Sequence, residues 1–171
     1  ARWQVWLGRA GGSASASVAP VAVSSQLPPA LASPSVAAGG APPADMFRLV
    51  NTEKDFQSVL EGLERAREFG FDLETTSLNP REARLCGVAL SFDPSFGVYI
   101  PVGHNGFGQQ LAEKKVLEAL QPFLMGERYK KIGQNLKYDL SVLHELWKRL
   151  GIRGPLSIPS NIEDTMVAGY V

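Results

Sequence analysis

The apolar residues of the C-terminal three-quarters of the chain fall into five short stretches that are typical of strands. In the stretch FGFDLE, residues 69–74, the apolar side chains fall on one side of a strand, and Asp72 and Glu74 fall on the other. Turn residues such as those of DPSFG separate two of the strands, so we expect an antiparallel meander of three strands. The predicted strands cover residues 46–50, 69–74, 84–92, 97–102 and 130–134.

Other stretches carry apolar residues at intervals of three and four, which is the spacing of helices with one buried face. Thr52 and Asp55 resemble a capping box at the start of the first helix. The second should end or kink before Pro122, because proline lacks an N–H group and its ring clashes with the preceding turn. The predicted helices cover residues 51–69, 111–124 and 135–151, and a last one begins within 160–171.

The expected order of elements is strand, helix, three strands, helix, strand and two helices. This order predicts an α/β fold, in which a mixed sheet carries helices on both faces. The last helix has no stop signal before Val171, so we expect the fold to be incomplete at that end. Sites in such sheets lie at the carboxyl ends of strands, where Asp72 and Glu74 fall.

Composition divides the chain near Asp45, because residues 11–44 are rich in Ala, Ser, Pro and Gly and carry no charge. We predict a low-complexity linker over 1–45 and a folded domain over 46–171. An organelle transit segment is the alternative for 1–45. The chain begins with Ala1 rather than Met, so we expect it to be a piece of a longer protein.

The charge balance argues against a long duplex as the ligand. All acidic residues lie from Asp45 onward, whereas two of the 17 Lys and Arg residues, Arg2 and Arg9, precede it. The folded part is therefore slightly acidic, and nucleic-acid contacts should be short or supported by another domain. A single Cys and two distant His residues argue against a zinc site, and no 18-residue apolar run predicts a membrane span.

Four acidic residues are candidates for chemistry. Asp72 and Glu74 are either a solvated pair or ligands of a divalent cation. Asp139 lies four residues after Asn135 on the predicted helix, so the two should share a face. Asp139 either compensates the helix dipole or forms a third carboxylate aimed at the pair. For Asp164 we expect a capping or ion-pair role.

Four stretches occur in an order that resembles a known family: FDLETTSL, YIPVGH, KKIGQNLKYDLSVL and EDTM. They resemble the 3′–5′ exonuclease (proofreading) domain of bacterial-type DNA polymerase I, a family-A DNA polymerase, and the likeness covers 46–171. It implies a ribonuclease H-like fold and two divalent cations, Mg²⁺ or Mn²⁺, held by four acids from three motifs.

The resemblance implies a role for each matching residue. Asp72 would bridge both metals, Glu74 would bind the first metal and the 3′-hydroxyl, and Asp139 would serve the second metal. The positions that would hold nucleotides or line a single-strand channel are Thr75, Leu78, Gln134, Asn135, Lys137 and Tyr138.

The third motif of the family, Tyr-x-x-x-Asp, does not occur in the 171 residues. We expect it after Val171, and we expect this chain to be weakly active or inactive. The implied partners are a single-stranded DNA 3′ end and a polymerase domain in the same full-length chain, with no membrane contact. The implied location is the bacterial cytoplasm or nucleoid, or a plastid or mitochondrion if 1–45 is a transit peptide.

Two alternatives to a DNA exonuclease stay open. One is an RNase D-like RNA 3′ exonuclease, because that family shares the same motifs and fold. The other is a non-catalytic nucleic-acid-binding module that has kept the fold.

Overall fold

A computed structural model describes residues 46–106, 108–153 and 159–170. The chain divides into two units, Ala1–Pro42 and Pro43–Val171, and the described residues all belong to the second. The predicted linker over 1–45 lies outside the described residues. No helix in the described part of the chain is long and apolar enough to cross a membrane.

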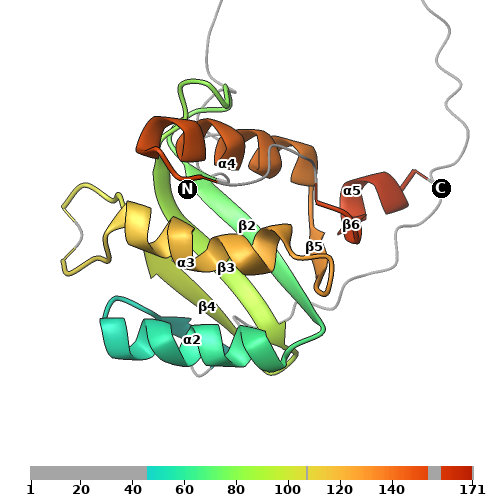
Figure 1. Ribbon diagram of the computed structural model, residues 1–171, viewed down its shortest axis with the longest axis horizontal. Coiled ribbons are helices and arrows are strands. Elements are labelled where there is room, and N and C mark those ends of the chain that lie inside the picture. Colours follow the sequence, from blue (N-terminus) through green and yellow to red (C-terminus); the bar gives the residue numbers. More distant parts are fainter. Residues whose placement is uncertain (1–45, 107, 154–158, 171) are drawn as a thin grey trace, which may run out of the picture. The chain divides into compact units, whose positions relative to one another are not determined.

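Six strands and four helices make up the described part of the second unit (Figure 1). The strands are β1 (Phe47–Leu49), β2 (Glu68–Thr75), β3 (Leu85–Asp93), β4 (Phe96–Pro101), β5 (Lys130–Gly133) and β6 (Ile162–Asp164). The helices are α2 (Glu53–Arg65), α3 (Glu113–Met125), α4 (Leu136–Leu150) and α5 (Thr165–Ala168).

The strands form one mixed sheet in the order β1-β4-β3-β2-β5-β6. The meander β2-β3-β4 is antiparallel, as predicted, while β1 pairs parallel with β4, β5 with β2, and β6 with β5. Within the meander, Asp72 lies opposite Ala89, which in turn lies opposite Tyr99. The α/β class and the mixed sheet predicted from the sequence are therefore confirmed.

The three long helices α2, α3 and α4 cover the same face of the sheet (Figure 1). The sequence predicted helices on both faces, and the three long helices of the described residues lie on one of them. The reason is topological. Each of these helices joins two parallel strands, and each connection moves in the same direction across the sheet. Right-handed crossovers in one direction place their helices on one face.

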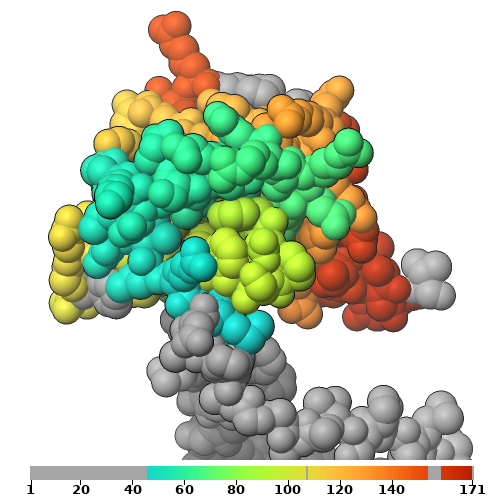
Figure 2. Space-filling model, turned by 90° about the horizontal axis from the view of Figure 1, so that it is seen from below, coloured from blue at the N-terminus to red at the C-terminus, as the bar shows by residue number. Residues whose placement is uncertain are grey.

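The register sorts the strand side chains between a helix-covered face and an open face. Phe71 lies opposite Leu90 and Leu73 opposite Val88, and all four are buried. Because side chains alternate along a strand, Asp72 and its neighbours of the same parity point to the open face. Figure 2 shows yellow-green strand residues at the molecular surface beside the cyan α2 helix.

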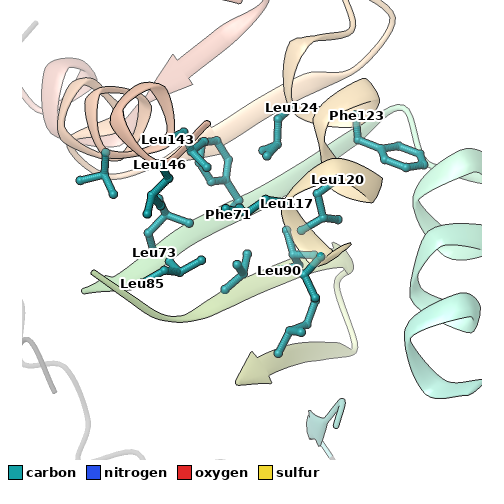
Figure 3. Close-up of a cluster of buried hydrophobic side chains, with 14 of the residues drawn as sticks. Phe71, Leu73, Leu85, Leu90, Leu117, Leu120, Phe123, Leu124, Leu143 and Leu146 are labelled. Carbon is teal, nitrogen blue, oxygen red and sulfur yellow. The ribbon is translucent and has the colours of Figure 1, made fainter. Parts of the chain in front are cut away.

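The core fills the space between the covered face and the helices (Figure 3). Leu117 and Leu120 of α3 and Leu143 and Leu146 of α4 point toward the sheet, and each is at most 3% exposed. Burying a leucine of this size contributes about 1.5–3 kcal/mol. The covered face therefore provides a rigid support, and the open face is left for polar side chains.

Helix α3 continues through Pro122 to Met125, whereas the sequence predicted an end or kink before the proline. The expectation of an early end was wrong. Proline removes one backbone hydrogen bond, but Phe123 and Leu124 are both buried and hold the last turn against the core. The apolar contacts of this last turn outweigh the local preference.

The C-terminal end also differs from the expectation. A helix does begin within 160–171, at Thr165, but the strand β6 precedes it, and the sequence did not predict this strand. Ile162 and Glu163 pair in parallel with β5, which extends the sheet by one strand. The helix predicted from residue 135 begins at Leu136, because Asn135 adopts a left-handed conformation with φ 58°.

Candidate active site

The candidate site lies at the carboxyl end of β2, on the open face of the sheet. Asp72 and Glu74 lie there two residues apart, and both are half-buried. The neighbouring strand contributes Gly87, which lies opposite Glu74. The sequence prediction that both carboxylates lie on one face at a strand end is confirmed.

A tyrosine near Glu74 contacts a histidine. A Cβ atom at Gly87 would lie 2.3 Å from the Tyr99 hydroxyl oxygen, so the phenol occupies the space that a side chain would fill. The hydroxyl of Tyr99 is 2.5 Å from Nε2 of His104. Burial, followed by the charge of Glu74, raises the pKa of Tyr99 to about 12. Tyr99 is therefore a neutral hydrogen-bonding group at physiological pH.

The first turn of α4 carries Asp139, which has 0% of its surface exposed. A carboxylate whose only role is to balance the helix dipole should be exposed to solvent. Asp139 is enclosed instead. Asn135 precedes the helix in a left-handed conformation and so does not share a helical face with Asp139. The predicted pairing of Asn135 with Asp139 on one helix face was therefore wrong.

Tyr138 joins the first turn of α4 to the segment that follows β2. Its hydroxyl lies 2.7 Å from Oγ1 of Thr75 and donates to the main-chain carbonyl of Ser77. Thr75 follows Glu74 directly, and Tyr138 precedes Asp139. The contact therefore brings the two carboxylate-bearing segments to the same end of the sheet.

Asp164 lies at the start of α4, although it is far away in sequence. Its carboxylate accepts hydrogen bonds from the main-chain N–H groups of Asn135 and Leu136, each at 2.8 Å. It also caps α5, by accepting from the N–H of Met166 at 3.0 Å. Burial raises the pKa of Asp164, but these N–H groups together outweigh it and lower that pKa. The predicted capping role is confirmed and includes a second helix.

The remaining predicted site residues differ in exposure. Leu78 is 68% exposed, and Gln134 and Lys137 are also exposed, so all three can meet a ligand. Tyr138 is only 9% exposed, and its hydroxyl is engaged inside the protein. Thr75 is half-buried against it. The substrate contacts assigned to these residues stay predictions.

A groove of about 720 Å³ lies along the outer side of α4, beside Asp164. Lys137 lines it from the helix, and Arg81 lines it from the segment after β2. The carboxylates of Glu145 and Asp164 also line the groove and balance these two cations, and Leu140 and Trp147 add apolar surface. His144 also lines the groove and is half-buried.

The chemistry of Asp72, Glu74 and Asp139 fits a hard divalent cation, because such cations prefer oxygen ligands. Within the described ranges, however, no group of three or more His, Cys, Asp or Glu side chains is placed to hold a metal ion. The assignment of these three carboxylates as metal ligands therefore stays a prediction.

A mixed sheet with three long helices on one face and two carboxylates at the end of one strand matches the expected ribonuclease H-like α/β fold. A family model described as 3′-5′ exonuclease matches residues 47–171. The chain therefore belongs to this 3′-5′ exonuclease family.

Relatives among characterised proteins agree with this assignment. The chain is 33% identical over 127 residues to DNA polymerase I of Pseudomonas aeruginosa, and the match covers 73% of this chain and 13% of the relative. DNA polymerase I of Borreliella burgdorferi is 32% identical over 127 residues, with the same two coverages. The chain thus spans about an eighth of the length of these relatives.

Solved structures show the same fold at low identity. The Aedes aegypti Nibbler EXO domain has a TM-score of 0.57 at 16% identity, covering 74% of this chain and 56% of that chain. Trypanosoma brucei RNase D has a TM-score of 0.51 at 18% identity, covering 70% and 37%. These likenesses support the architecture.

Two features of the site were missed in the sequence. The sequence predicted a capping role for Asp164 but not that it caps α4, because the two segments are separated by 28 residues. The contact between Tyr99 and His104 has a weak local signal, since both belong to the YIPVGH stretch that carries the family resemblance.

Proposed function

We propose that this chain is the 3′–5′ exonuclease domain of a DNA polymerase I, and that it removes nucleotides from single-stranded DNA 3′ ends by phosphodiester hydrolysis. The observation that carries the proposal is the family match over 47–171 together with Asp72 and Glu74 at the carboxyl end of β2. The DNA polymerase I relatives support proofreading as the context and a polymerase domain in the same full-length chain as the partner.

Exonucleases of this family generally depend on divalent metal ions. In this chain Asp72, Glu74 and Asp139 would hold two of them, Mg²⁺ or Mn²⁺. Bound there, such a pair supplies an activated water and stabilises the leaving 3′-oxygen. The half-buried positions of Asp72 and Glu74 leave their open-face side accessible to a ligand.

The rest of the site would bind and orient the DNA end. Leu78 is exposed and apolar, so it can pack against the last bases without reading their sequence. Lys137 is exposed in the groove and can neutralise a phosphate. Gln134 precedes α4 and is exposed, and it offers an amide for hydrogen bonds to sugar or phosphate.

We propose low activity for the 171 residues on their own, because they contain no Tyr-x-x-x-Asp motif. In the family this motif supplies the fourth acid and the side chain that orients the attacking water. Loss of a positioned general base or its equivalent commonly removes about 10²–10⁴-fold of rate.

The proposal is tested on 5′-labelled single-stranded DNA with Mn²⁺ or Mg²⁺. We expect slow shortening from the 3′ end that is lost in Asp72→Ala. Glu61→Ala is the matched control, because it removes an exposed carboxylate on α2 away from the site and should leave the rate unchanged. Equal rates in Asp72→Ala and the unaltered chain would contradict the assignment.

The same assay with an RNA strand of identical sequence separates DNA from RNA preference. A higher rate on RNA would favour the RNase D-like alternative. Calorimetric titration with Mn²⁺ addresses the non-catalytic alternative, which predicts no metal binding at Asp72 and Glu74.

A further inference from the structure

The start of α4 depends on an acceptor from outside the helix. A helix begins with N–H groups that have no partner within it, and a usual N-cap residue is extended and accepts with its own side chain. Asn135 is instead left-handed, with φ 58° and ψ 44°, and its side chain makes no capping hydrogen bond. The acceptor for this helix must therefore come from another segment.

Asp164 supplies this acceptor with both of its carboxylate oxygens. Oδ1 accepts from the N–H of Asn135 and Oδ2 from the N–H of Leu136, each at 2.8 Å. A charged acceptor makes such bonds stronger than a neutral one, and its negative charge also suits the positive end of a helix. The two bonds fix both the position of the helix start and its direction.

The strand that carries Asp164 is itself tied to β5. Asp164 lies opposite Gly133, the last residue of β5, and Oγ1 of Thr165 donates to the carbonyl of Gly133 at 3.2 Å. The corner between β5 and α4 is also tightly packed. A Cβ atom at Gly133 would lie 2.4 Å from the Leu136 side chain and 2.8 Å from the carbonyl oxygen of Phe71.

We propose that Asp164 is a positioning residue for the carboxylate site, since it holds the first turn of α4 and with it Asp139. This inference rests on the proposed function of Asp139. Asp139 lies three residues after Leu136 in the same turn, so a shift of the helix start moves its carboxylate. A misplacement of about 1 Å in such a site can cost about 10²-fold in rate.

An ordinary cap would stabilise the fold without affecting the site, and α2 provides one for comparison. Thr52 caps α2 by accepting from the N–H of Asp55 at 3.2 Å, and it is far from the candidate ligands in sequence and element. Thr52→Ala is therefore the matched control. Asp164→Asn keeps the size of the side chain and one acceptor oxygen but removes the charge. Its effect on Mn²⁺ binding should therefore lie between those of Asp164→Ala and the unaltered chain.

The experiment compares the full 171-residue chain with Asp164→Ala, Asp164→Asn and Thr52→Ala by calorimetric titration with Mn²⁺ and by amide hydrogen exchange. We expect Asp164→Ala to weaken Mn²⁺ binding at least tenfold, Asp164→Asn to weaken it less, and Thr52→Ala to leave it within twofold. Exchange at the Leu136 amide should become faster in the Asp164 variants alone.

The outcomes separate this inference from the proposed function. Unchanged Mn²⁺ affinity in a folded Asp164→Ala chain would overturn the positioning role. If the unaltered chain binds no Mn²⁺, the metal assignment fails. The hydrogen-exchange data then decide whether Asp164 holds the first turn of α4. Faster exchange that extends through Tyr138 and Asp139 then supports the control of this turn by Asp164, and unchanged exchange there overturns it.

Discussion

The hydrogen bonds of Tyr138 connect α4 to the end of β2, and they permit a prediction about the stability of the fold. In Tyr138→Phe the ring is kept and only the hydroxyl is removed. That hydroxyl donates to the carbonyl of Ser77 and lies 2.7 Å from Oγ1 of Thr75, in a side chain that is 9% exposed. Tyr138→Phe therefore removes two hydrogen bonds at a buried position.

The magnitude follows from these two bonds. Each typically contributes about 0.5–1.5 kcal/mol net, which gives about 1–3 kcal/mol for the pair. Thr75 can also donate to the carbonyl of Ser77 at 3.2 Å, so part of the loss is recovered. We expect Tyr138→Phe to lower the free energy of unfolding by about 1–2 kcal/mol, with an unchanged urea m-value.

The assay is urea unfolding of Tyr138→Phe, Thr75→Val and the double variant. The coupling energy between the two sites should be about 0.5–1 kcal/mol, because both single variants break the same bond. Tyr170→Phe is the control, since Tyr170 is 87% exposed and should change little. If Tyr138→Phe lowers the free energy of unfolding by less than about 0.3 kcal/mol, or if the losses of the two single variants are strictly additive, the hydrogen bond between Tyr138 and Thr75 is refuted.

Two further predictions concern stability. Lys131 is fully buried with Nζ 2.7 Å from the carbonyl oxygen of Gly126, and burial lowers its pKa, against an opposing effect of Glu127. Between the lowered pKa of Lys131 in the folded chain and 10.5, the unfolded chain binds more protons than the folded chain. The free energy of unfolding should therefore rise with pH across this window. Urea unfolding at several pH values should show this rise, and the rise should be absent in Lys131→Met. Gly87→Ala should cost about 1–3 kcal/mol in the same assay, because its Cβ would lie 2.3 Å from the Tyr99 hydroxyl; unaltered stability would contradict this.

Local patterns in the sequence predicted the elements that carry the first two carboxylates. The alternation in FGFDLE places Asp72 and Glu74 on one face of β2, and the meander follows from the turn between β3 and β4. These features depend on residues close together in the chain, and side-chain alternation in a strand is a strict consequence of its geometry. Helix α4 was likewise visible from its apolar spacing.

Features that depend on distant contacts were not predictable in this way. Pro122 lies inside α3 because Phe123 and Leu124 are buried by the rest of the fold. Strand β6 has no signal in the sequence because three residues are too few to show a period, and only pairing with β5 makes them a strand. In both places tertiary packing overrides the local preference.

The start of α4 shows why a motif is not enough to define a site. The sequence identified Asp139 as a candidate, but its placement depends on contacts made by other segments. Tyr138 bonds to Thr75 on one side, and Asp164 bonds to Asn135 and Leu136 on the other. A substitution at Asp164 would leave both motifs intact in the sequence and still alter the site that they form. The proofreading function proposed for this chain therefore depends on residues outside the two carboxylate motifs.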